Sequence, residues 1–205
     1  NPAARPDILH QLSFTNSRHW KAGISYNRQL GESHRYFEGG DIPEVKLSFT
    51  VSDYNWGPLH LDRLVLGNYS ATIGQGLVMQ STDFRSPRYS GYGWNKRVNG
   101  IFSDLSRSQQ YALRGAGIQG SLFNKLKLMA FASKNDRDAI LNSDGESFST
   151  LISMYPRDDW GYFVQDTVDM LNAVQEVTYG GNLRYEFTPG TFVGVSSYES
   201  LYDKE

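Results

Sequence analysis

Apolar and polar residues alternate along much of this chain. The longest alternating stretch runs from Leu61 to Gln80 and carries neither a charge nor a proline from Leu64 onward. A period of two indicates a β-strand with two unlike faces. The stretch is long for a strand of a water-soluble protein, and an edge strand there would normally carry charges. It therefore predicts, within a large antiparallel sheet, either one very long strand or two strands that fold back at Gly67-Asn68.

Seven further segments show the same period, so the chain is expected to contain roughly eight strands. They are Leu9–Thr15, His19–Gln29, Glu44–Tyr54, Tyr111–Phe123, Lys125–Ser133, Glu176–Phe187 and Thr191–Tyr202. The segment Glu176–Phe187 has the clearest two faces. Its apolar set is Val177, Tyr179, Leu183, Tyr185 and Phe187, and its polar set is Glu176, Thr178, Asn182, Arg184 and Glu186.

Short and long connections alternate between these segments. Short turns are predicted at Asn55–Pro58, Asn124 and Thr188–Gly190, and long connections at Gly31–Pro43, Ser81–Gln110 and Lys134–Gln175, with a short helix near Asp166–Val174. Outer-membrane barrels have this asymmetry, and their strands must close because lipid satisfies no backbone hydrogen bond. The predicted fold is all-β: an antiparallel transmembrane β-barrel, or part of a larger one, with long extracellular loops. A sandwich or a curved sheet with one solvated face would alternate in the same way.

Composition favours the membrane interpretation. The chain has 205 residues with 13 Tyr, 20 Gly, no Cys and a net charge of −2. Chains rich in Tyr and Gly are typical of membrane barrels, and no apolar run reaches the length of a membrane-spanning helix. Residues 1–205 are expected to form one barrel portion, truncated at both ends, that does not close a barrel on its own.

The segment Leu64–Gln80, LVLGNYSATIGQGLVMQ, resembles a G-[ND]-Y…G-Q-G-L-[VT] signature. That signature belongs to the outer-membrane barrel region of Bacteroidota-type helix-hairpin-helix envelope proteins, which are related to competence proteins. The order downstream is also similar, with RGAGIQGSLFNKLKLMAFASKNDRDA followed by EVTYGGNLRY. The resemblance covers roughly Leu59–Tyr202 and implies a fold and a location in the bacterial cell outer membrane, but no reaction. No helix-hairpin-helix residues occur here, so no nucleic-acid partner is expected for this segment.

Two groups of residues are candidates for contacts. The long connection Ser81–Gln110 interleaves basic and aromatic residues that could bind an anion or a sugar, or could anchor lipid head groups: Arg85, Arg88, Tyr92, Trp94, Lys96 and Arg97. We expect this connection to fold over or into the mouth of the barrel. The second group is expected to face the lumen: Glu176, Asn182, Arg184 and Glu186.

The sequence offers no catalytic or cofactor-binding motif. Gly74-Gln75-Gly76 lacks the Lys-Ser/Thr and the helix of a phosphate-binding loop, and the four histidines show no metal-binding spacing. We therefore expect no catalysis, cofactor or metal, and an integral outer-membrane barrel protein that acts as a pore or as a scaffold or subunit of an envelope complex. Its expected partners are outer-membrane lipid and other envelope subunits. The alternative is a soluble or surface β-sheet protein that binds carbohydrate or acts as a hydrolase.

Overall fold

The computed structural model describes residues 8–17, 19–28, 45–74, 78–80, 99–106, 112–137, 139–142, 147–151 and 173–203. These residues form twelve β-strands and contain no helix. The strands are β1 (Ile8–Asn16), β2 (Trp20–Arg28), β3 (Val45–Trp56), β4 (Leu59–Ile73), β5 (Met79–Gln80), β6 (Gly100–Ser103), β7 (Leu113–Leu122), β8 (Leu126–Arg137), β9 (Ala139–Leu141), β10 (Phe148–Leu151), β11 (Val174–Thr188) and β12 (Thr191–Asp203).

Eight long strands form the main sheet in the order β1-β2-β3-β4-β7-β8-β11-β12, and every pair is antiparallel. This confirms the expected all-β antiparallel fold and the number of long strands. Within the described residues β1 and β12 are the two edges of the sheet, so these strands do not close a barrel. The expectation that the segment does not close alone is thus confirmed for the described part of the chain.

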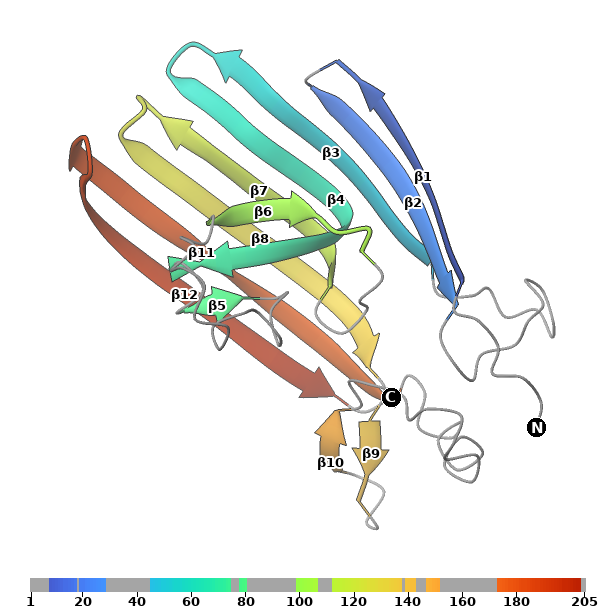
Figure 1. The fold of residues 1–205 in the computed structure, drawn as a ribbon. Coiled ribbons are helices and arrows are strands. Elements are labelled where there is room, and N and C mark those ends of the chain that lie inside the picture. The colour runs from blue at the N-terminus through green and yellow to red at the C-terminus, as the bar shows by residue number, and fades with distance from the viewer. Residues whose placement is uncertain are drawn as a thin grey trace, which may run out of the picture.

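The tight turns of the main sheet lie together at one end. Residues 57–58, 123–125 and 189–190 join β3 to β4, β7 to β8 and β11 to β12, at the upper end in Figure 1. The β3 strand continues to Trp56, so the turn expected at Asn55–Pro58 is limited to Gly57-Pro58. The longer connections leave from the opposite end, as the alternation of short and long connections predicted.

The stretch around Gly67 is one strand and not a hairpin, so the second of the two expectations for it is wrong. β4 runs through Gly67, where φ is 94° and a Cβ atom would lie 2.2 Å from the carbonyl oxygen of Leu47. Only glycine tolerates both the left-handed backbone and this close approach. Beyond it β4 leaves β3 and pairs with β6 and β5, and these strands cross in front of the main sheet (Figure 1).

We call this second layer, made of Asn68–Ile73, β5 and β6, the inner layer. It packs on β7 and β8 through one apolar core: Val65, Tyr69, Ala71, Ile73, Ile101, Leu113, Met129 and Phe131. Gly117 lets the two layers approach, since a Cβ there would lie 2.9 Å from two carbons of Ile101. The Tyr69 hydroxyl donates a hydrogen bond to the carbonyl oxygen of Ala132 at 2.8 Å. The face of the main sheet that carries this layer is the inner face, and the opposite face is the outer face.

The two long connections hold short strands that the sequence pattern does not reveal. β6 lies in the connection 81–110, and β9 pairs with β10 in the connection that follows β8. β8 also continues to Arg137, beyond the expected end at Ser133. Of the helix expected near Asp166–Val174, residues 173–174 are described, and Val174 begins β11 as a strand. The remainder lies outside the described residues.

Candidate functional site

Each of the eight long strands carries at least one exposed apolar side chain on the outer face of the main sheet. The strand register places Leu12, Ile24 and Leu47 in one row across β1, β2 and β3. Leu128, Leu183 and Val195 form a second row across β8, β11 and β12. All six side chains are exposed, with Leu12 at 70% and Val195 at 65%. An apolar face that spans eight strands is far larger than the patches that water-soluble monomers leave uncovered.

Aromatic side chains gather at the turn end of this outer face. They are Phe14, Trp20, Tyr54, Trp56, Phe123, Tyr185 and Phe187. Several contact one another: Trp20 Nε1 donates a hydrogen bond to the Tyr54 hydroxyl at 2.9 Å, and Tyr185 and Phe187 meet edge to face at 5.0 Å. Aromatic rings with a polar tip are favoured where hydrocarbon meets head groups. This group of aromatic residues therefore has the arrangement of the aromatic girdles that lie at the membrane–water interface of membrane barrels.

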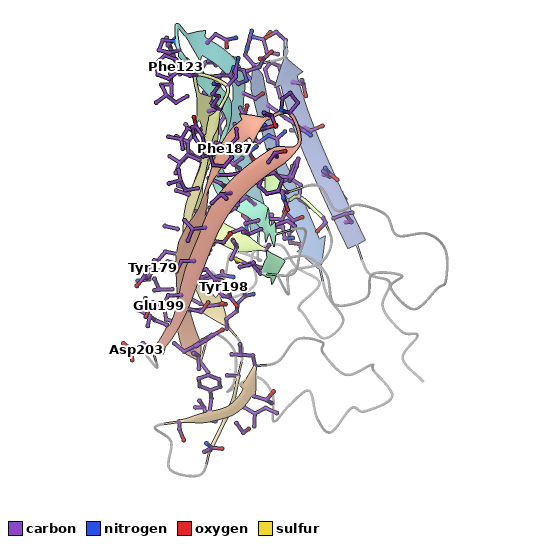
Figure 2. The ribbon with its side chains drawn as sticks, turned by 90° about the vertical axis from the view of Figure 1, so that its left-hand side faces the viewer. Phe123, Tyr179, Phe187, Tyr198, Glu199 and Asp203 are labelled. Carbon is purple, nitrogen blue, oxygen red and sulfur yellow. The ribbon has the colours of Figure 1, made fainter. Side chains whose placement is uncertain are left out.

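One aromatic residue with a polar tip, Tyr179, lies farther along the same face of β11. Tyr179 is eight residues from Phe187 on β11, which is about 27 Å along the strand and about 20 Å once the strand is tilted by roughly 40°. The Tyr179 hydroxyl donates a hydrogen bond to the Glu199 carboxylate. Tyr179 and Glu199 project from the side of β11 and β12 opposite to Tyr198 (Figure 2). The distance between Tyr179 and Phe187 is close to the apolar band of about 25 Å in outer-membrane barrels.

The four residues expected to face the lumen share the inner face of β11. Glu176 lies 2.5 Å from Arg137 Nε and also accepts hydrogen bonds from Thr178 and Tyr202. Asn182 donates hydrogen bonds to Ser196 and to the carbonyl oxygen of Val195. The apolar set of the same strand lies on the outer face, because successive side chains of a strand point to opposite sides.

Charges also alternate in sign on this inner face, near the turn end. Arg184 lies 3.5 Å from Glu186 and stacks over the ring of Phe192 at 4.5 Å. Lys127 of β8 approaches the same Glu186 carboxylate at 3.2 Å, and the backbone amide of Gly190 donates to it. The polar residues predicted for this face are therefore held in ion pairs and hydrogen bonds across three strands.

The sequence pattern missed a second polar centre, under the inner layer. Lys46 of β3 and Asp104 form an ion pair at 3.4 Å, and both side chains are more than nine-tenths buried. Arg63 donates a hydrogen bond to the carbonyl oxygen of Ile101 at 2.6 Å and lies over the Phe102 ring. The alternation of β3 places Lys46 on its polar face, but its partner comes from a connection 58 residues later.

The basic-aromatic candidates Arg85, Arg88, Tyr92, Trp94, Lys96 and Arg97 lie outside the described residues. The neighbouring part of the same connection, Asn99–Ser106, is described and lies on the inner face through β6. The expectation that the basic and aromatic part of this connection folds over or into the mouth of a barrel stays a prediction.

Metal-binding groups and membrane-spanning helices were sought in the described part of the chain. Three or more His, Asp or Glu side chains do not gather there closely enough to hold a metal ion. No helix of these residues has the length and apolarity to cross a membrane.

Comparisons with protein-family models, with curated proteins and with solved structures find no match to this chain. The resemblance to the envelope-protein barrel region stays a prediction, and the function has to be argued from the geometry of the two faces.

Proposed function

We propose that this chain is a wall segment of an outer-membrane β-barrel that serves as a scaffold in the bacterial envelope. The observation that carries the proposal is the apolar outer face with its aromatic girdle at the turn end. Leaving large apolar side chains in water costs about 1.5–3 kcal/mol for each one that could be buried. Contact with lipid would remove the free-energy cost of exposing these side chains to water over the whole outer face.

The inner face supports the same reading. Beside the inner layer, the ion pairs, amides and hydroxyls of β11 and β12 suit a wet lumen, whereas a water-soluble sandwich would carry an apolar surface there against a second sheet. The alternative of a soluble or surface β-sheet protein would need a cover for the outer face, and no described segment lies on it. The catalytic branch of that alternative would also need an acid, base or nucleophile set, and the carboxylates that β11 carries on the inner face are held in ion pairs instead.

The inner layer favours a scaffold over a wide diffusion pore. It packs through a dry apolar core against β7 and β8, so part of the lumen is permanently filled. Among the described residues β1 and β12 are edges without a neighbouring strand, and in lipid their backbone groups would need one. Outer-membrane lipid is the expected partner of the outer face, and other envelope subunits are the further expected partners.

Membrane fractionation tests the proposal. The protein expressed in a Gram-negative cell should stay with the outer-membrane fraction after a high-salt and carbonate wash and should need detergent for extraction. The extracted protein should migrate differently on a gel before and after boiling, since a folded barrel resists unfolding in detergent. Release by the carbonate wash, with migration unchanged by heat, would reject the membrane wall and favour the soluble sheet.

A further inference from the structure

The inner layer is held in two different ways on its two sides. On the β7 and β8 side the contact is apolar, and Ile101, Met129 and Phe131 are all at most 6% exposed. On the β2 and β3 side the contact is made by the segment Ser103–Ser106, which we call the strap, and it combines a charged pair with one apolar side chain, Leu105. A packed apolar core is hard to open, whereas a polar contact can exchange its partners for water.

The strap is held against β2, β3 and β4 by specific contacts. The Asp104 amide donates to the carbonyl oxygen of Asn68 at 3.0 Å, and the Asp104 carboxylate pairs with Lys46. The Leu105 side chain lies over Gly23, where an added Cβ atom would stand 2.3 Å from Leu105 Cδ1. The absence of a side chain at Gly23 thus makes room for Leu105, and the Lys46–Asp104 ion pair holds the strap beside it.

Buried hydroxyls near the strap are left without partners. Ser25, Ser48 and Thr50 are at most 7% exposed on the inner face of β2 and β3, and none of their hydroxyl oxygens has a hydrogen-bond partner among the described residues. The register sets Lys46 opposite Ser25 and Thr50 opposite Lys21. A buried hydroxyl without a partner is costly, and hydration would remove that cost.

An open polar pocket of about 270 Å³ adjoins the strap. Its lining is Gln11, Lys21, Ser103, Asp104, Leu105 and Ser106. It therefore lies between the β1 and β2 wall and the strap, on the side of the lumen that the apolar core does not fill. Its volume and polar lining suit several water molecules.

We propose that the strap is a latch over a polar passage for water and small hydrated ions along the inner face of β1, β2 and β3. The inner layer stays fixed on β7 and β8, and the strap lifts when the Lys46–Asp104 pair opens and Leu105 leaves Gly23. Lifting the strap hydrates Ser25, Ser48 and Thr50 and extends the open pocket along the inner face of β2 and β3. The proposal rests on the proposed membrane barrel.

A reversible lock tests the latch. These 205 residues contain no cysteine, so Gly23→Cys with Leu105→Cys introduces one cysteine pair between wall and strap. The intact protein is reconstituted in planar bilayers, and ion conductance is measured before oxidation, after oxidation and after reduction. We expect oxidation to lower the conductance severalfold and reduction to restore it on the same molecules. Each single cysteine variant is the control and should be insensitive to both treatments.

A release variant tests the same latch in the other direction. Asp104→Asn removes the charge that fastens the strap and should raise the conductance severalfold over the natural protein. The latch would be overturned if the natural protein, the oxidised double-cysteine variant and Asp104→Asn conduct equally well. It would also be overturned if none of the three conducts. Flotation of the same proteins with lipid vesicles distinguishes failure of the latch from failure of the membrane barrel. If the protein floats with the vesicles but the variants do not change its conductance, only the latch is rejected. If the protein does not float, the membrane barrel itself is rejected.

Discussion

Val195 and Ser196 are neighbours on β12 whose side chains point to opposite faces of the sheet. Val195 pairs with Leu183 on the outer face, and Ser196 pairs with Asn182 on the inner face. Val195→Arg should lower the free energy of unfolding by about 2–4 kcal/mol, since a charge near the middle of the hydrocarbon layer is costly. Ser196→Arg should cost less than about 1 kcal/mol, as a surface change does. Both are measured by urea unfolding of the protein in lipid vesicles.

The pair of variants discriminates between the two environments of the outer face. In water, an arginine at a position that is 65% exposed would be nearly neutral. Equal stability of the two variants would therefore place the outer face in water and contradict the membrane wall.

Gly67 is the residue at which β4 leaves the plane of the main sheet. Gly67→Ala should be strongly destabilising, because the new Cβ atom meets the Leu47 carbonyl oxygen in addition to the strain of a positive φ. Gly57→Ala is the matched control, since its φ is also positive and no atom lies within 4 Å of the added Cβ. The strain common to both costs about 1–3 kcal/mol, so the loss for Gly67→Ala should exceed that for Gly57→Ala in the same unfolding measurement. Equal losses of unfolding free energy would show that the close contact with the Leu47 carbonyl oxygen adds nothing to the cost of Gly67→Ala.

At the scale of the strands, the alternation predicted the eight members of the main sheet and both faces of β11. It could not predict that β4 turns away after Gly67, because the pattern of Tyr69, Ala71 and Ile73 is the same whether the strand stays in the sheet or folds over it. β6 has four residues, too few for a period to be visible. The partner of Lys46 depends on where Asp104 is placed by that fold, and spacing along the chain carries no information about it.

The docking of the strap on β3 can be measured by a double-mutant cycle. Lys46→Met or Asp104→Leu alone should lower the free energy of unfolding by about 3–5 kcal/mol, because each breaks a buried ion pair by removing one of its two members. The double variant should be close to the natural protein, since replacing both members of a buried ion pair by apolar groups is often neutral. Additive losses would mean that the two side chains do not interact in the folded protein.

At the scale of the whole molecule, the turns and the long connections define opposite ends of the sheet. Outer-membrane barrels keep tight turns in the periplasm and long loops outside. Pro189 in the β11–β12 turn and Ser147 beside β10 are both exposed and lie at opposite ends of the strands. On intact cells a membrane-impermeant thiol reagent should label Ser147→Cys and should label Pro189→Cys only after the outer membrane is permeabilised. Labelling of Pro189→Cys alone on intact cells would mean the reverse orientation.

The apolar core between the inner layer and β7 and β8 also sets an order of events during biogenesis. The main sheet can grow hairpin by hairpin, because each long strand pairs with the long strand that precedes it in the chain. The inner layer is different: it belongs to β4 and to the segment before β7, yet it is completed by Met129 and Phe131 of β8. Water must leave this core before neighbouring strands enclose it, so the nascent sheet has to wrap around a layer that is already folded. For the proposed membrane wall, damage to the inner layer should therefore appear first as slow or failed insertion into the membrane, and only afterwards as lower stability of the inserted protein.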